Sequence, residues 1–216
     1  DAATHYATTL KECSIHSYLI RKRSPSTQVV CLVTPDGERT MRTYIAASAL
    51  LTAEDIPEEP FSRCRFFHAE GYALYTYEAL EQAYIYAKKN GVTTSLDLAS
   101  FEIVRDNKER ILHLLTDYID LVFANADEAL MLTGCDDEES AAEKIAKDTN
   151  TQTVVLMGTR GCWHCSEKEK VHYPAYPVTP VDTTGAGDLF ACGFIHGILK
   201  NLTAEESAHC GALLGN

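Results

Sequence analysis

The sequence lacks any apolar run long enough to span a lipid bilayer, which takes about 18 residues, and its first residues are neither basic nor apolar enough for a signal peptide. Basic residues are also few, because 19 Lys and Arg stand against 31 Asp and Glu, for a formal net charge of −12. Such a surface repels phosphate backbones and anionic membranes. These absences predict a cytoplasmic chain without a nucleic-acid or membrane partner. They do not exclude a local anion-binding site.

No internal repeat, low-complexity tract or linker rich in Pro, Gly and Ser interrupts the 216 residues. Domains usually have about 150 residues, so the length predicts one compact domain with an appendage. The eight cysteines have no disulfide-framework spacing, and a chain of this size needs no crosslinks. We expect most of them to be small buried packing residues.

The first segment, residues 1–62, differs in pattern from the rest. Thr27 to Thr34 and Arg39 to Ile45 are rich in β-branched residues, and Pro35-Asp36-Gly37 between them is a turn sequence. This pattern predicts a β-hairpin, with a short helix earlier in the segment.

From residue 63 to residue 216, short apolar runs alternate with longer helical stretches, a pattern typical of an α/β domain with a largely parallel sheet. The predicted strands are 64–69, 92–98, 121–125 and 153–157, and the predicted helices are 76–89, 102–116, 127–133 and 138–148. A second hairpin is predicted at 162–166 and 170–173, followed by helices that start near Gly185 and Thr203, the latter with a capping-box match to Glu206.

Polar residues stand where the predicted strands end. Glu70, Asp97 and Asn125 each close or follow an apolar strand, and the loop 158–161 follows the fourth. In open α/β sheets ligands bind outside the carboxyl ends of the strands, so these positions are predicted to share one edge of the sheet. The alternative is that polar residues merely end strands.

The run DTTGAGD at 182–188 precedes an apolar helix. Its glycines let the backbone turn tightly and approach a ligand, while the helix N-terminus presents N–H groups to an anion. Asp188 lies in the first turn, where a carboxylate can cap the helix or act as a base toward a hydroxyl. A purely structural turn is the alternative interpretation.

Other phosphate-binding motifs are absent. No G-x-x-x-x-G-K-[ST] occurs, and Phe190 stands where a dinucleotide fingerprint would place its third glycine. The glycine-rich loop, H-R-D and D-F-G of protein kinases are missing too. These absences exclude Walker-type NTPases, Rossmann dehydrogenases and protein kinases.

The segment DTTGAGDLFACGF resembles the C-terminal signature of the PfkB, or ribokinase-like, family of sugar and nucleoside kinases. NADE at 125–128 is similar to the family's N-x-x-E motif, LMGTRG at 156–161 to its nucleotide-binding loop, and PDGERTM to part of its β lid. The resemblance implies a ribokinase-like α/β fold, with a mainly parallel sheet flanked by helices and a small β lid, present in part. Residues 63–216 would then form the nucleotide-binding and catalytic domain.

The resemblance also implies an ATP- and Mg²⁺-dependent kinase that phosphorylates a small sugar or nucleoside. Asp188 would be the general base, and the amides of Gly185, Ala186 and Gly187 would stabilise the transferring phosphate. The other implied roles are nucleotide contacts from Asn125, Gly158, Thr159 and Gly161, water-mediated Mg²⁺ binding by Asn125 and Glu128, substrate contact by Glu70, and a K⁺ site at Asp182 and Thr184. Asp97 lacks the Asn and Arg that accompany it in relatives, which puts a role for it in doubt.

Several alternatives stay open at this point. The hairpin and the EGY at 70–72 look somewhat like bacterial-type adenosine kinases, while ribose or fructose is the other substrate class. A binding or regulatory protein on a kinase scaffold is an alternative of another class. Cys162 and Cys165, with His172, have the spacing of a redox pair or half a zinc site.

The resemblance carries two further expectations. The chain is expected to start downstream of the family's N-terminal substrate motifs and to stop before its last nucleotide-binding segment. A homodimer through the lid hairpin is expected as well.

Overall fold

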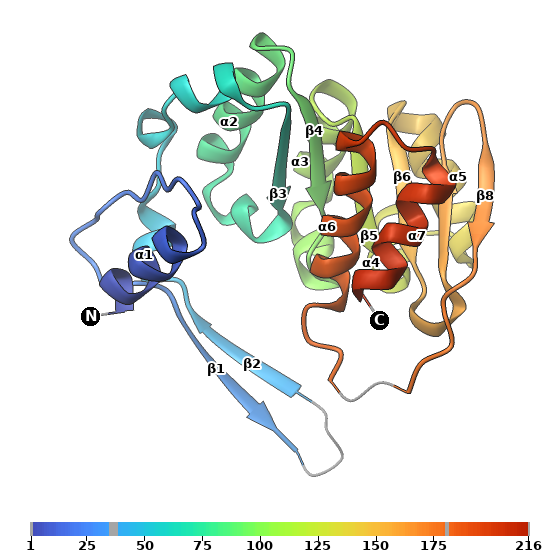
Figure 1. Cartoon of the computed structure of the whole chain (residues 1–216), viewed down its shortest axis with the longest axis horizontal. Coiled ribbons are helices and arrows are strands. Elements are labelled where there is room, and N and C mark those ends of the chain that lie inside the picture. The colour runs from blue at the N-terminus through green and yellow to red at the C-terminus, as the bar shows by residue number, and fades with distance from the viewer. Residues whose placement is uncertain (1, 35–38, 180–181, 216) are drawn as a thin grey trace.

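The computed structural model of the chain describes residues 2–34, 39–179 and 182–215 (Figure 1). The N-terminal segment holds α1 (Ala2–Glu12) and an antiparallel hairpin of β1 (Gln28–Val33) and β2 (Arg39–Tyr44). The predicted hairpin is confirmed in its two strands, while its predicted turn at 35–37 lies outside the described residues. Every residue of β1 is exposed, so this hairpin adds little to the core.

A six-stranded sheet with the order β3-β4-β5-β6-β7-β8 forms the body of the chain. The first four strands run parallel, and β7 pairs antiparallel with both of its neighbours, β6 and β8. The strand bounds are Phe66–Glu70, Thr93–Asp97, Leu121–Asn125, Gln152–Leu156, Cys162–Cys165 and Lys170–Tyr173, in the order β3 to β8. The mainly parallel sheet, its four predicted strands and the second hairpin are confirmed.

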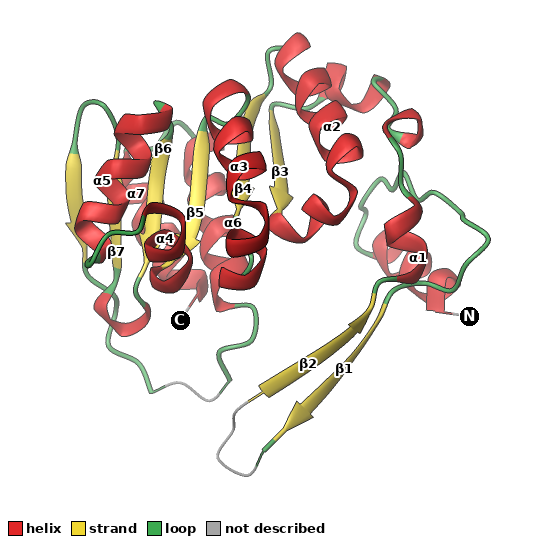
Figure 2. Ribbon diagram, turned by 180° about the vertical axis from the view of Figure 1, so that it is seen from behind, coloured by secondary structure: helices red, strands yellow, loops and turns green. Residues whose placement is uncertain are grey.

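Helices cover both faces of this sheet (Figure 2). On one face lie α2 (Tyr77–Lys89), α3 (Phe101–Asp117), α4 (Ala126–Thr133) and α5 (Glu138–Thr149), and on the other α6 (Ala186–Leu199) and α7 (Ala204–Gly215). Short 3₁₀ helices occupy Ala46–Leu50, Ala53–Asp55, Glu59–Arg63, Gly71–Thr76 and Gly158–Arg160. No helix in the described ranges is long and apolar enough to cross a membrane.

Alternation along the strands separates two cores. Val122 and Ala124 pack under α2 to α5, whereas Leu121 and Phe123 pack under α6. The face covered by α6 and α7 is called the α6 face below. Residues two positions apart in a strand point to the same face, and so do register partners on neighbouring parallel strands. The side chains that are paired with Phe123 across β4 and β3 therefore lie on the α6 face as well.

The prediction for the cysteines is wrong for most of them. Only Cys162 and Cys165 are buried, and all eight are free thiols. Four are exposed, because they lie in the open N-terminal segment, before β3 or on the outer side of α6: Cys13, Cys31, Cys64 and Cys192. Apolar neighbours in sequence did not distinguish a buried segment from an exposed one.

One histidine lies inside the core on the α6 face. His164 is 2% exposed and packs between Tyr173 and Phe194, with ring centroids 6.5 Å and 6.1 Å away. Its Nδ1 lies 3.3 Å from Oε1 of Glu169 without forming a hydrogen bond. Burial lowers the pKa of His164, and the charge of Glu169 opposes this only in part.

Replacing His164 by leucine should make the free energy of unfolding depend less on pH in the acid range. Below about pH 6.5 the unfolded chain takes up a proton that buried His164 resists, so the native protein loses stability as pH falls further, by up to ~1.4 kcal/mol per pH unit. The leucine variant should lose less stability than the parent between about pH 6.5 and pH 5 in urea denaturation. The control variant is His5→Leu, because His5 is exposed. An equal loss of unfolding free energy in the parent and in His164→Leu over this pH range would contradict this account.

Candidate active site

Polar residues at the carboxyl ends of neighbouring strands line one edge of the sheet. Glu70 of β3 and Asp97 of β4 are register partners, and Asn125 of β5 is paired with Leu156 of β6, two residues before the loop at Gly158. The prediction that these positions share an edge is confirmed. Glu70, Asp97 and Asn125 are called the strand-end row below.

Asp188 lies at the start of α6, within electrostatic range of this row. Its charge raises the pKa of Glu70 and of Asp97, in each case after burial as the larger cause. Asp97 reaches a pKa of about 6, to which the charge of Glu70 also contributes, while a hydrogen bond from the Ala99 amide (2.8 Å) opposes the rise. The structure thus places Asp97 in the site although the family's usual neighbours are missing.

The turn before α6 has the geometry that its glycines predict. Gly185 is the N-cap with φ 77°, and a Cβ placed on it would stand 3.7 Å from Oδ2 of Asp188. Around a Cβ placed on Gly187 the space is open. The Ala186 amide donates to the Thr183 carbonyl at 3.2 Å, so a ligand would have to replace that carbonyl to use this amide. Gly187 therefore offers the most open approach to an anion.

Asp182 and Thr184 form a local turn just before this N-cap. The backbone amide and the hydroxyl of Thr184 both donate to Oδ1 of Asp182, at 2.8 Å and 2.6 Å. These contacts bring together the two residues assigned to a monovalent cation, and their role toward K⁺ stays a prediction.

Asn125 and Glu128 form a reciprocal cap at the N-terminus of α4. The Asn125 amide and side-chain nitrogen donate to the Glu128 carboxylate at 2.8 Å and 2.7 Å, and the Glu128 amide donates back to Oδ1 of Asn125 at 2.9 Å. Glu128 is 3% exposed. Burial, followed by the charges of Asp97 and Asp127, raises its pKa to about 7, against the hydrogen bond from Asn125.

These carboxyl groups fit a divalent cation that is held largely through water. Like charges contribute to the raised pKa values of Glu70, Asp97 and Glu128, and a nearby cation would offset that repulsion. No group of three or more His, Cys, Asp or Glu side chains in the described part of the chain could hold a metal ion by itself. Mg²⁺ keeps several waters and binds through one or two carboxylates plus phosphates, which suits this arrangement.

The loop after β6 is shaped by two glycines with positive φ. Gly158 has φ 58° and Gly161 φ 89°, and a Cβ on Gly161 would stand 2.0 Å from the Tyr173 carbonyl oxygen. The Met157 amide donates to the Gly161 carbonyl at 2.8 Å and closes the loop. Thr159 is exposed at its tip. The role of this loop toward a nucleotide stays a prediction.

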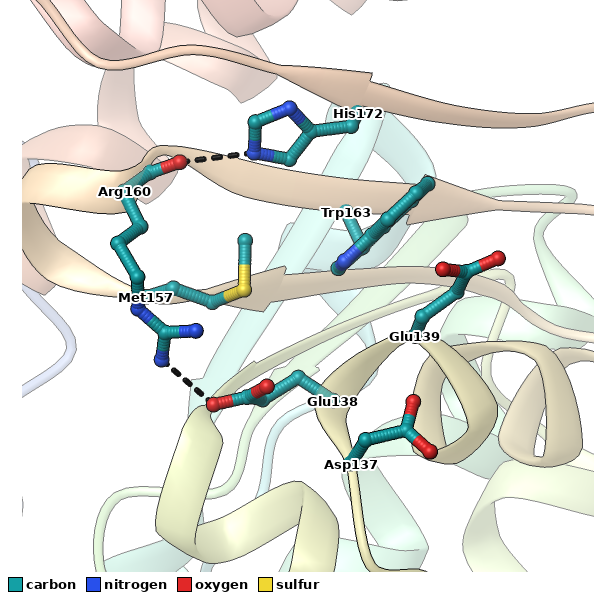
Figure 3. A pocket seen from close by; sticks show the side chains of 7 residues that line it. All are labelled: Asp137, Glu138, Glu139, Met157, Arg160, Trp163 and His172. Atoms are coloured by element: carbon teal, nitrogen blue, oxygen red, sulfur yellow. Dashed lines mark hydrogen bonds and ion pairs between the residues drawn. The ribbon is translucent and has the colours of Figure 1, made fainter.

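A hollow of about 560 Å³ adjoins this loop and is lined by side chains of the loop, of the start of α5 and of β7 and β8 (Figure 3). It lies on the face of the sheet that α2 to α5 cover, opposite the α6 face. Trp163 in its wall packs with the core under α2 to α5. Arg160 crosses one end: its guanidinium pairs with Glu138 of α5, and its carbonyl accepts a hydrogen bond from Nε2 of His172 at 2.8 Å (Figure 3). The hollow therefore shows how the loop is anchored rather than where phosphate transfer would occur.

Replacing Arg160 by alanine tests the predicted role of the loop 158–161 in nucleotide binding. If the loop has that role, the substitution should weaken nucleotide binding more than it lowers the free energy of unfolding. The pair with Glu138 is half exposed, so its loss should cost at most about 1 kcal/mol of unfolding free energy. A less restrained loop should raise KM for ATP by about threefold with kcat unchanged. Lys144→Ala, which removes another exposed pair on α5, should leave KM unchanged; an equal KM in parent and Arg160→Ala would show that the pair does not position the loop.

The alternative redox or zinc site at Cys162 and Cys165 is wrong. The two thiols belong to different cores on opposite faces of the sheet. Burial raises the pKa of Cys162 to about 12 and that of Cys165 to about 11, which disfavours the thiolate needed for redox chemistry or metal binding. His172 packs against Trp163 instead, with ring centroids 5.2 Å apart.

Sequence reasoning missed one polar pair beneath the strand-end row. His68 of β3 and Ser95 of β4 are register partners, with Nδ1 and Oγ 2.7 Å apart. The sequence did carry one signal for this pair: His68 lies two positions before Glu70 in a predicted strand, and residues two positions apart in a strand point to the same face.

Known proteins share this architecture. The fructokinase of Klebsiella pneumoniae is 31% identical over 204 residues, which cover 82% of this chain and 63% of that protein. Adenosine kinase from Sinorhizobium meliloti superposes with a TM-score of 0.90 at 28% identity, over 100% of this chain and 68% of that one. A putative ribokinase II from E. coli in complex with ATP and Mg²⁺ gives a TM-score of 0.76 at 25% identity, over 87% of this chain and 63% of that one.

These similarities confirm the ribokinase-like fold, and the chain spans 63% of the length of the fructokinase it matches. The family model described as pfkB family carbohydrate kinase matches residues 1–216. The sequence signature at 182–188, the strand-end row and the superpositions agree with that match. The chain belongs to the pfkB family of carbohydrate kinases.

Proposed function

We propose that this protein is an ATP-dependent kinase that transfers the γ-phosphate to a hydroxyl group of a small sugar or nucleoside. The observation that carries the proposal is the position of Asp188, at the N-terminus of α6 and within electrostatic range of Glu70 and Asp97. A base beside a helix N-terminus serves the two needs of this reaction, a proton acceptor and a stabilised anion.

In the proposed reaction Asp188 accepts the proton of the substrate hydroxyl. The hydroxyl oxygen forms a bond to the γ-phosphorus while the bond from that phosphorus to the β-γ bridging oxygen breaks, leaving ADP. The amides of Gly185 and Gly187 stabilise charge on the transferring group, and the Ala186 amide joins them when that group replaces the Thr183 carbonyl as its hydrogen-bond acceptor. Glu70 orients the acceptor. Positioning and electrostatics thus supply most of the rate enhancement.

Mg²⁺ is the second cofactor of the proposal. When bound, it neutralises the phosphate charge. Asn125 and Glu128 hold its waters, and Gly158, Thr159 and Gly161 contact the nucleotide. The related E. coli structure contains ATP and Mg²⁺, which supports this assignment. K⁺ at Asp182 and Thr184 completes the proposed set of ions.

We favour an adenosine-like nucleoside as the acceptor, because the lid hairpin and the EGY at 70–72 look somewhat like those of bacterial-type adenosine kinases, and an adenosine kinase is among the structures that superpose over the whole chain. The full-length protein should be assayed with Mg·ATP against adenosine, cytidine, ribose and fructose, with ADP release and phosphorylated product both measured. Adenosine should give the highest kcat/KM. A sugar turned over more than about tenfold better would overturn the nucleoside assignment and keep the kinase, whereas no product from any acceptor would favour a binding protein on a kinase scaffold.

The proposal places this enzyme in the cytoplasm as a homodimer that pairs through the hairpin β1–β2. Apolar side chains on both strands are more than half exposed, among them Val30 (58%), Val33 (65%) and Met41 (53%). A second copy would cover them.

A further inference from the structure

Gly71 follows Glu70 at the carboxyl end of β3 and is the first residue of the 3₁₀ helix Gly71–Thr76. It is buried, and a Cβ placed on it would stand 2.5 Å from the carbonyl oxygen of Leu98 and 3.2 Å from that of Asp97. Its φ is not positive, so the backbone conformation itself would accept alanine. Glycine is therefore required here by the close approach of two backbones.

The segment 97–100, which faces Gly71, is a closed turn. Oδ1 of Asp97 accepts a hydrogen bond from the Ala99 amide at 2.8 Å, and the Leu98 carbonyl accepts one from the Ser100 amide at 2.9 Å. Ala99 has φ 67°, a left-handed conformation that is unfavourable for alanine. Such a conformation persists only where the surrounding structure holds it.

Both ends of this turn are tied to neighbouring elements. Leu98 is fully buried, and its amide donates to the Phe123 carbonyl of β5 at 3.0 Å. Ser100 is the N-cap of α3, and its Oγ accepts a hydrogen bond from the Ile103 amide at 3.3 Å. The turn therefore cannot recede from Gly71 without breaking a contact with β5 or α3.

The contact between Gly71 and the turn 97–100 is called the backbone clamp below. Resting on the proposed kinase function, we propose that the backbone clamp positions Glu70 and Asp97 for binding of the acceptor substrate. Glu70 directly precedes Gly71, Asp97 begins the turn, and the two acids are register partners. Main-chain contact at the ends of β3 and β4 thus fixes the two carboxyl groups relative to each other, and Gly71 and Ala99 are positioning residues that act through them.

Replacing Gly71 by alanine tests the backbone clamp in the full-length protein. The added Cβ should push the ends of β3 and β4 apart, so we expect KM for the acceptor to rise about tenfold. KM for ATP should stay within about threefold, because the loop 158–161 and the turn before α6 are not part of the clamp. Equal KM for the acceptor in an active parent and in Gly71→Ala would overturn the inference while leaving the kinase intact.

Gly91→Ala is the matched control. Gly91 precedes β4 at its other end and has φ 68°, and no atom lies within 4 Å of a Cβ placed there. The variant adds backbone strain without a clash, so it should lower the urea midpoint of unfolding and leave both KM values unchanged. If it raised KM for the acceptor as much as Gly71→Ala does, general destabilisation would explain both effects and the inference would fail.

Substitutions of Ala99 test the other half of the clamp, and they do so even where Gly71→Ala does not fold. Ala99→Gly fits the left-handed backbone and keeps the amide that Asp97 holds, so KM for the acceptor should stay within about twofold of the parent. Ala99→Val is β-branched and strained at this φ, so it should raise that KM about three- to tenfold. Equal KM for the acceptor in the two variants would contradict the role of the turn.

Amide hydrogen exchange tests the clamp without turnover. Displacing the end of β4 should weaken the hydrogen bond from the Leu98 amide to the Phe123 carbonyl. We expect this amide to exchange about tenfold faster in Gly71→Ala than in the parent, with a much smaller change in Gly91→Ala. Equal exchange in the parent and in Gly71→Ala would overturn the inference. A parent that phosphorylates no acceptor would instead overturn the proposed function, whatever the exchange rates show.

Discussion

Replacing Asp188 by asparagine should lower kcat for phosphate transfer by about a thousandfold, since asparagine keeps the size of the side chain but cannot accept the hydroxyl proton. Asp188 is exposed in the first turn of α6, so folding should be little affected. The dissociation constant for Mg·ATP should stay within about threefold, because binding depends on other groups. Product formation and calorimetric ATP binding check the two halves of the prediction.

Glu205→Gln is the matched control for this substitution. Glu205 is also an exposed acid in the first turn of a helix, α7, which begins at the opposite end of the α6–α7 pair (Figure 1). Its loss should leave kcat unchanged. A modest, equal effect of the two substitutions would mean that Asp188 acts as a helix cap and not as a base.

Gly161→Ala should destabilise the fold and disable the loop after β6. Gly161 has φ 89° and ψ −142°, and an added Cβ would stand 2.0 Å from the Tyr173 carbonyl and 2.8 Å from the Ala175 amide. Both contacts are with backbone, so β8 or the loop must move. We expect a loss of about 3 kcal/mol or more in unfolding free energy and a rise of about tenfold or more in KM for ATP.

Gly158→Ala separates clash from conformational strain in the same loop. Gly158 has φ 58°, and no atom lies within 4 Å of a Cβ placed there. Only the left-handed backbone is unfavourable for alanine, at a cost of about 1–2 kcal/mol. Urea denaturation of both variants should show the larger loss for Gly161→Ala, and equal losses would refute the role assigned to the clash with Tyr173.

The local patterns that the sequence carries were enough to predict most elements. β5 matches its predicted bounds, and the Thr203–Glu206 capping box forms, with Glu206 accepting from the Thr203 amide at 2.8 Å. The signature at 182–188 also predicted the N-cap at Gly185. These features depend on neighbours in the chain, and periodicity and capping chemistry report on such neighbours directly.

Features that depend on strand register could not be predicted from the sequence. The pairing of His68 with Ser95 joins residues 27 positions apart, and only the alignment of β3 with β4 brings them together. The place of Asp97 could not be predicted because its sequence neighbours differ from the family pattern, whereas its position beside Glu70 is set by the sheet. Burial of the cysteines failed as a prediction for the same reason, since exposure is a tertiary property.

The central claim is that the protein moves the γ-phosphate of ATP onto an alcohol. The most direct test is ³¹P NMR of the full-length protein with Mg·ATP and the acceptor panel, run beside Asp188→Asn. The account predicts a phosphate monoester that accumulates in equal amount to ADP with the parent and is nearly absent with the variant. ADP that accumulates with free phosphate and without a phosphate monoester, or a monoester formed equally well by Asp188→Asn, would contradict it.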